Sequence, residues 1–251
     1  PPEALKRLDK LRYSWRGDHI EERALQLSYR LNSDKGDVSD ALSAGATLLR
    51  FFDVSRQGPN FLPDLQAKLH EALDPARKIP LDKAAGLYWE YRDLSPSGAE
   101  GDLLVSRLAQ RLQEAAMYSR AADLLEYQLF NRVHDLARGA LSTRVASLHI
   151  LAGRADRALD VIKRSADPSY PNGMHYDRKR VEAVALTHLG KGKEALAVLQ
   201  DVPSSAALQA EISWKQRDWQ GLANAGSQML PPSGALSNVG QASVLRHAIA
   251  L

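Results

Sequence analysis

The chain has 251 residues, of which 44% are hydrophobic and 25% charged, a composition typical of a globular protein with one or two domains. Its 33 basic and 30 acidic residues give a net charge of +3, which is too small to indicate binding to nucleic acid or an anionic membrane. The absence of cysteine excludes thiol catalysis, zinc–thiolate sites and disulfides.

The N-terminal stretch PPEALKRLDKLRYSW, residues 1–15, is charged and amphipathic, unlike a signal peptide. No apolar run approaches the roughly 20 residues needed to cross a bilayer. We therefore expect no membrane insertion within this segment, and cytoplasm and periplasm remain equally open as compartments. Because the chain does not begin with Met, we expect it to be a fragment or processed form of a longer protein.

Most of the sequence has the apolar spacing of amphipathic helices. In LLVSRLAQRLQEAA, residues 103–116, apolar residues recur every three or four positions, and no convincing run alternates as a strand would. Turn-forming clusters of Gly, Pro, Ser and Asp interrupt the pattern at short intervals. The sequence predicts an all-α protein of roughly a dozen short helices, either an irregular bundle or an α-solenoid.

In chain order, the first repeated pattern lies at about 22–55, where DKGDVSDALSAG places Ala41 after a turn. Residues 56–101 do not fit the pattern and are interpreted as a helical insertion or two degenerate units. Four further units are predicted over 102–235, with a small or apolar residue after each turn at Ala121, Ala158, Ala195 and Leu222. The first two steps between these positions are 37 residues each.

This pattern resembles the tetratricopeptide repeat (TPR), a pair of antiparallel helices of about 34 residues. The positions that carry the resemblance are Val105, Leu108, Ala109, Leu112, Tyr118, Ala121 and Leu125 in the first unit, Val145, Ala146, Gly153, Ala158 and Ile162 in the second, Ala183, Leu186, Gly190, Ala195 and Leu199 in the third, and Ala210, Trp219 and Leu222 in the fourth. Glu182 and His149 depart from the family's usual leucine and tyrosine.

The resemblance implies a right-handed α-solenoid from a bacterial TPR-containing protein. Its expected parts are an irregular helical N-terminal region over 1–101, four repeats over 102–235 and a capping helix over 236–251. On the capping helix, we expect Val239, Ala242, Leu245 and Ile249 to form one apolar face.

The stretch LGKGKEALAVL, residues 189–199, contains the only sequence suggestive of a phosphate-binding loop. Such a loop requires a preceding strand and a terminal Lys-Ser/Thr, whereas here a helix precedes the glycines and Glu194-Ala195 follows. We interpret Gly190 as the residue after a helix C-terminus, where a positive φ favours glycine, and Gly192 as a loose linker position.

No pattern predicts catalysis, a metal site or a cofactor. The seven histidines lack metal-ligand spacing, and HEALD, residues 70–74, has Asp74 where the zinc-protease motif requires a second histidine. No GxSxG elbow or defensible carboxylate pair is present. We therefore expect a segment that is not an enzyme.

Two aromatic features leave alternatives open. Trp219 is expected in the core, whereas Trp214 is either inter-helix packing or an apolar anchor for a bound segment. The loop 166–180 places Tyr170 and two other aromatic rings beside basic residues, as a base-stacking surface would. Because the net charge of the chain is small, the sequence favours an ordinary loop that does not bind nucleic acid.

The TPR alignment places a set of mixed polar side chains on the inward face of the first helices. This predicted groove consists of Ser106, Gln110, Gln113, Thr143, Ser147, Arg180, Val184, Thr187, His188, Glu211, Trp214 and Lys215. Only Arg180 fits the family's carboxylate clamp, so we expect a different protein or peptide partner. The alternatives are a structural or self-associating spacer in an envelope or motility assembly, and the regulatory segment of an enzyme.

Overall fold

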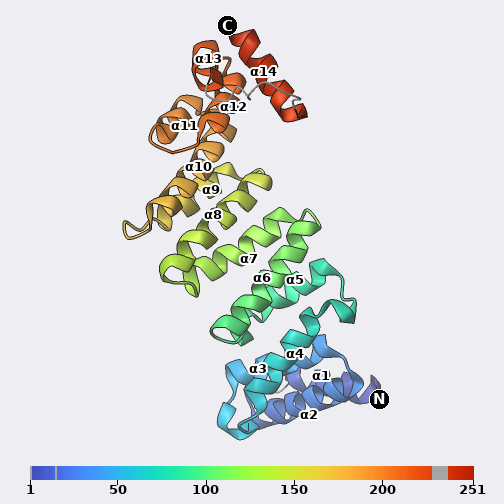
Figure 1. Cartoon of the computed structure of the whole chain (residues 1–251). Helices are drawn as coiled ribbons and strands as arrows, with labels where there is room; N and C mark the ends of the chain where they lie inside the picture. The colour runs from blue at the N-terminus through green and yellow to red at the C-terminus, as the bar shows by residue number, and fades with distance from the viewer. Residues whose placement is uncertain (1, 15, 228–236) are drawn as a thin grey trace. The chain divides into compact units, whose positions relative to one another are not determined.

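The computed structural model describes residues 2–14, 16–227 and 237–251, which form helices, turns and loops without a strand (Figure 1). This confirms the all-α prediction for the described part of the chain. The residues fall into two compact units, Pro1–Glu114 and Ala115–Leu251. Within the described ranges, every helix is too short or too polar to serve as a membrane span.

The first unit holds six α-helices and three short 3₁₀ turns among its described residues. These are α1 (Pro2–Ser14), α2 (His19–Lys35), α3 (Val38–Phe51), η1 (Val54–Gln57), α4 (Phe61–Leu73), η2 (Pro75–Arg77), α5 (Leu81–Glu90), η3 (Arg92–Leu94) and α6 (Ala99–Glu114). Helices α2, α3 and α4 pack in sequence, with Tyr29 edge-on to Phe61 at 5.3 Å between ring centres. Arg50 ties α3 to the segment after α5 through two hydrogen bonds to the Asp93 carboxylate, at 2.8 and 3.0 Å.

The second unit holds eight α-helices among its described residues. These are α7 (Tyr118–Asn131), α8 (Asp135–Leu151), α9 (Ala155–Arg164), α10 (Asn172–His188), α11 (Gly192–Leu199), α12 (Ala206–Gln216), α13 (Trp219–Ser227) and α14 (Asn238–Ala250). Each of the pairs α8–α9, α10–α11 and α12–α13 packs as an antiparallel hairpin, and α8 also packs against α7 and α10 (Figure 1). Residues 228–236, the end of the predicted repeat segment, lie outside the described residues.

One turn geometry recurs through the chain. Gly36, Gly153, Gly190 and Arg217 have φ between 56° and 76°, and each is followed by one linking residue and then a new helix. In all four turns the linking residue's N–H donates to the carbonyl five positions back, at 2.8 to 2.9 Å. This bond satisfies a carbonyl at the helix C-terminus, where left-handed backbone favours glycine. Ala116 also has a positive φ of 57°.

The small or apolar positions predicted from the pattern all lie five residues after these turns. Ala41, Ala121, Ala158 and Ala195 are fully buried, and Leu222 is 2% exposed. Each backbone N–H at these positions donates to the linking residue's carbonyl, which closes the first turn of the new helix. These five side chains are therefore buried in the first turn of the new helix. The predicted repeat beginning at Asp102 stays a prediction as a pair, because α6 and α7 belong to different units.

The two glycines of residues 189–199 have different structural roles. Gly190 has a φ of 75° and follows Leu189, the C-cap of α10, in agreement with its interpretation as a residue past the helix C-terminus. Gly192 was expected to be a loose linker residue, and that expectation was wrong: it is the buried first residue of α11. A Cβ at position 192 would collide with the Gln216 side chain, so this glycine permits close packing between α11 and α12.

Candidate functional site

The predicted groove residues occupy four helices. Ser106, Gln110 and Gln113 lie on α6 in the first unit, and the other nine lie in the second unit, with Thr143 and Ser147 on α8, Arg180, Val184, Thr187 and His188 on α10, and Glu211, Trp214 and Lys215 on α12. None of the twelve is fully buried. The structure brings the α8 and α10 residues onto helices that pack together, and it joins the α12 residues to the C-terminal helix.

Arg180 is held by contacts within the chain. Its guanidinium donates to the Asp177 carboxylate at 2.7 Å and to the Pro203 carbonyl at 2.7 Å. The second contact links α10 to the loop before α12. Arg180 therefore has a structural role in this conformation, which the sequence pattern did not indicate.

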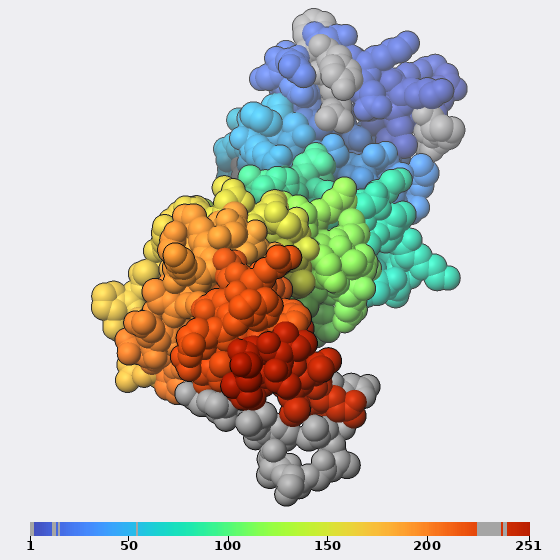
Figure 2. Space-filling model, turned by 90° about the horizontal axis from the view of Figure 1, so that it is seen from above, coloured from blue at the N-terminus to red at the C-terminus, as the bar shows by residue number. Residues whose placement is uncertain are grey.

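The α12 part of the predicted groove lies against α14. Glu211 pairs with Arg246 of α14 and with Lys215 at 3.7 Å. The Arg246 guanidinium also lies 5.2 Å from the centre of the Trp214 ring, a cation–π contact. Figure 2 shows the dark red surface of α14 adjoining the orange surface of α12 and α13. Arg246 therefore occupies one face of the Trp214 ring.

One of the two tryptophan predictions requires correction. Trp219, expected in the core, is 43% exposed and meets Trp214 edge-on at 5.8 Å between ring centres. It begins α13, two residues after the turn at Arg217. Trp214 thus takes part in inter-helix packing, which was one of its two proposed roles.

The residues expected to form the apolar face of the capping helix are exposed where the structure describes their side chains. Leu245 is 63% exposed and Ile249 is 54% exposed, and Ala242 is exposed as well. The side chain of Val239 lies outside the described residues. Among the side chains of α14 that the structure describes, His247 is the buried one, 9% exposed. Helix α14 packs against α13, and Leu245 and Ile249 of the apolar stripe remain exposed.

In the loop before α10, Tyr170 is buried and does not offer its ring as a base-stacking surface. Tyr170 is 4% exposed, and its hydroxyl donates to the Ser165 carbonyl at 3.1 Å. The Arg178 guanidinium lies 5.4 Å from the Tyr170 ring and donates to the hydroxyls of Ser142 and Ser165 and to the Ile162 carbonyl. These contacts join α10 to α8 and α9, and burial of the guanidinium lowers the pKa of Arg178.

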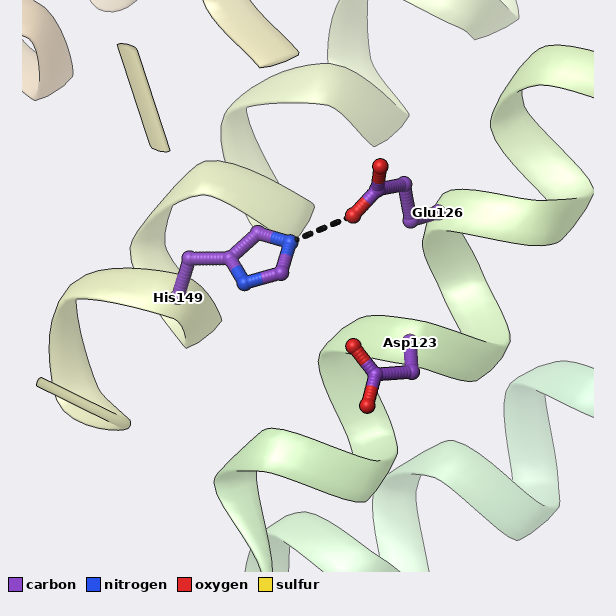
Figure 3. A group of neighbouring side chains, drawn as sticks. All are labelled: Asp123, Glu126 and His149. Carbon is purple, nitrogen blue, oxygen red and sulfur yellow. Dashed lines mark hydrogen bonds and ion pairs between the residues drawn. The ribbon is translucent and has the colours of Figure 1, made fainter. Parts of the chain in front are cut away.

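A buried ionic cluster that sequence reasoning missed joins α7 to α8 (Figure 3). His149 Nε2 lies 2.8 Å from the Glu126 carboxylate, and the His149 side chain is fully buried. Burial lowers the pKa of His149, and the Glu126 carboxylate opposes this shift. Asp123 lies one turn before Glu126, and the three residues offer ligand atoms within 4.8 Å of one another. Their distance in sequence, 23 residues from Glu126 to His149, gave no metal-ligand spacing.

The charges around this cluster favour an ion-pair network over a metal centre. An Asp–Glu–His set suits a divalent cation in its donor atoms. Arg154, however, pairs with Asp123 at 3.0 Å, and Arg157 pairs with Glu126 at 3.3 Å. A divalent cation would have to compete with these guanidinium groups at short range. We interpret the cluster as the polar link that holds α7, α8 and α9 together.

Comparison with known proteins gives no match, either to a protein-family model or to a curated protein.

Proposed function

We propose that the chain is a non-catalytic interaction scaffold, in which TPR-like helix pairs form a right-handed solenoid and bind a peptide or partner protein through their first helices. The proposal rests on one turn that recurs at Gly36, Gly153, Gly190 and Arg217. In each case the new helix begins two residues after the positive-φ residue, with the same backbone hydrogen bonds. Stacked hairpins of this kind present an extended surface, which is suited to extended or helical ligands.

The face of α8 and α10 is the best candidate for the binding surface. Thr143, Ser147, Val184 and Thr187 are half-buried, and His188 is exposed. The three hydroxyls donate to carbonyls of their own helices, at 2.7 to 2.8 Å, and keep lone pairs that can accept from a partner's N–H groups. Val184 adds an apolar contact, and none of the five forms an ion pair with another described residue.

The proposed surface is smaller than the groove predicted from the sequence. Arg180, Glu211 and Trp214 are engaged within the chain, so the proposed surface centres on the remaining α8 and α10 side chains. Mixed polar and apolar side chains without fixed charge pairs are typical of non-obligate interfaces.

The proposal is tested by selecting peptides on the purified chain from a random displayed library. The selected peptides are then mapped by amide hydrogen exchange. We expect slower exchange in α8 and α10 on binding, because a bound segment orders these helices. Selection of no peptide, or protection confined to other helices, would contradict the proposed surface.

A specific observation favours self-association as a second candidate function. Leu245, Ile249 and Leu251, on and just after α14, are 63%, 54% and 88% exposed. Contiguous exposed apolar side chains commonly mark a contact surface. Light scattering over a concentration series distinguishes the candidates: a mass rising above 27.6 kDa, abolished by Leu245→Glu/Ile249→Glu, would favour self-association.

A further inference from the structure

Helix α14 places a guanidinium group at a carboxylate and an aromatic ring on α12. The Arg246 guanidinium pairs with Glu211 and lies 5.2 Å from the centre of the Trp214 ring. Trp219 at the start of α13 meets the same ring edge-on, at 5.8 Å between ring centres. A carboxylate beside an indole suits a planar cation, because the guanidinium can pair with the one and lie over the other.

The contact between Arg246 and α12 remains open to solvent. The side chains of Arg246 and Glu211 are 38% and 39% exposed, and Trp214 is half-buried. An ion pair with this exposure contributes little to holding two helices together. Lys215 lies 3.7 Å from Glu211 on the same helix and stays beside the carboxylate when Arg246 leaves. A second guanidinium group can therefore take the place of Arg246.

Helix α14 is attached to the second unit by few buried side chains. Among its described side chains, which exclude Asn238 and Val239, His247 alone is buried. Helix α9, with 10 residues against the 13 of α14, buries Ala155, Ala158, Val161 and Ile162. A short helix is marginally stable alone in water, and an element with few buried contacts opens more easily than the whole domain unfolds. We therefore expect α14 to leave α12 and α13 while the other helices of the unit stay folded.

The sequence of α14 indicates which kind of segment this site on α12 accepts. The helix NVGQASVLRHAIA contains no acidic residue, and Arg246 is its only arginine. A carboxylate next to this arginine would approach Glu211 and be repelled by it. A segment that docks in the same way is therefore a helix with an arginine and no acidic residue nearby.

We propose that the Glu211–Trp214 site binds an arginine on a helical segment of a partner protein, and that α14 occupies the site as a competitor within the chain. This proposal rests on the scaffold function proposed above and adds a second binding surface to it. The site contains no residue of α8 or α10. Failure of binding at α8 and α10 therefore leaves this proposal standing, and failure here leaves the α8–α10 surface unaffected.

The test is an NMR titration of the 251-residue chain with a blocked peptide that has the sequence of residues 237–251. The peptide contains no tryptophan, so the indole N–H signals report on the chain alone. We expect saturable shifts of the Trp214 and Trp219 signals, while that of Trp89, on α5 of the first unit, stays unchanged. A peptide with glutamine in place of its arginine should bind about tenfold more weakly or less, and lysine should also weaken binding.

Charge-reversal variants test the role of α14 as a competitor. Arg246→Glu should tighten the Kd of the peptide by about tenfold, because repulsion from Glu211 raises the fraction of chains with an open site. Arg120→Glu changes an exposed arginine of α7, alters the net charge equally and should leave the Kd unchanged. Adding Glu211→Gln to Arg246→Glu should abolish the gain. Circular dichroism verifies that each variant is folded.

Amide hydrogen exchange of the unaltered chain provides a measurement that needs no variant. The central amides of α14 should exchange at least about tenfold faster than those of α10. The proposal would be overturned by equal exchange in the two helices, by an absence of saturable indole shifts, or by equal affinity of the arginine and glutamine peptides. Equal affinity of the peptide for wild type and Arg246→Glu would also overturn it. A mass that rises with concentration and falls back in Arg246→Glu would assign the site to α14 of a second copy and overturn the assignment to a partner protein.

Discussion

The guanidinium of Arg246, near the end of α14, lies 5.2 Å from the centre of the Trp214 ring on α12. The same guanidinium pairs with Glu211, one turn earlier on α12. Through these contacts the C-terminal helix is held against α12. Because a terminal repeat otherwise exposes an apolar face, we propose that α14 caps the second unit in spite of its outward apolar stripe.

Removing residues 236–251 should therefore lower the Tm and the solubility of the chain. The single change Arg246→Ala should have a smaller effect, about 0.5–1 kcal/mol, because the ion pair is more than one-third exposed and solvent weakens it. Thermal denaturation measures both, with Lys163→Ala on α9 as an exposed control. An unchanged Tm after the deletion would contradict the capping role.

The positive-φ turn predicts opposite effects for two substitutions. Gly190→Ala should destabilise the chain by about 1–2 kcal/mol, because alanine is strained at a φ of 75°. Arg217→Gly should stabilise it, because glycine relieves the strain of a side chain at a φ of 56°. Urea unfolding measures both changes. Gly173→Ala is the control, since φ at this helical position is not positive and nothing lies within 4 Å of its added Cβ.

The fold could be predicted from the sequence to the extent that it depends on local pattern. Apolar spacing indicated helices, and the residues five positions after each turn, such as Ala158 and Ala195, are buried as the pattern required. Both signals are local, because helix periodicity and turn chemistry act over a few residues.

The candidate site was less predictable because its contacts join residues far apart in sequence. Arg246 lies 35 residues after Glu211, and Arg180 reaches the Pro203 carbonyl across 23 residues. Helical alignment places a side chain on a face but does not identify which neighbouring segment covers it. For the same reason, the alignment did not indicate that α14 lies against Trp214.

Acidification should selectively weaken the second unit through His149. Burial lowers its pKa in the folded state, so below the ordinary value of about 6.5 the unfolded chain binds more protons than the folded chain. The free energy of unfolding should therefore fall as pH decreases from above 6.5 toward the folded-state pKa. His149 faces Glu126 and Asp123, together with the Arg154 charge, which also lowers its pKa.

Urea unfolding of wild type and His149→Gln at a series of pH values isolates this contribution. The wild type should lose more stability on acidification than the variant, because the other six histidines are common to both chains. Parallel pH profiles, or an NMR titration of His149 at or above its ordinary pKa, would show that burial does not control this residue.

Arg178 should be important for stability rather than for binding. Arg178→Ala removes the hydrogen bonds to Ser142, Ser165 and the Ile162 carbonyl, and it leaves space in a buried region. We expect a loss of about 2–4 kcal/mol in the free energy of unfolding. Lys179→Ala, the next residue along α10, should change it by less than about 0.5 kcal/mol. Equal effects of the two substitutions would show that the Arg178 contacts are unimportant.

The central claim, that α8 and α10 carry the binding surface, is tested most directly by calorimetry with a peptide selected on the chain. Val184→Arg/His188→Glu places charge on the proposed surface, and Asp156→Arg/Lys163→Glu places matched charges on exposed positions of α9. With both variants shown to be folded by circular dichroism, the first should weaken the Kd by about tenfold or more, and the second should leave it unchanged. Equal affinity of the peptide for wild type and Val184→Arg/His188→Glu would contradict the claim.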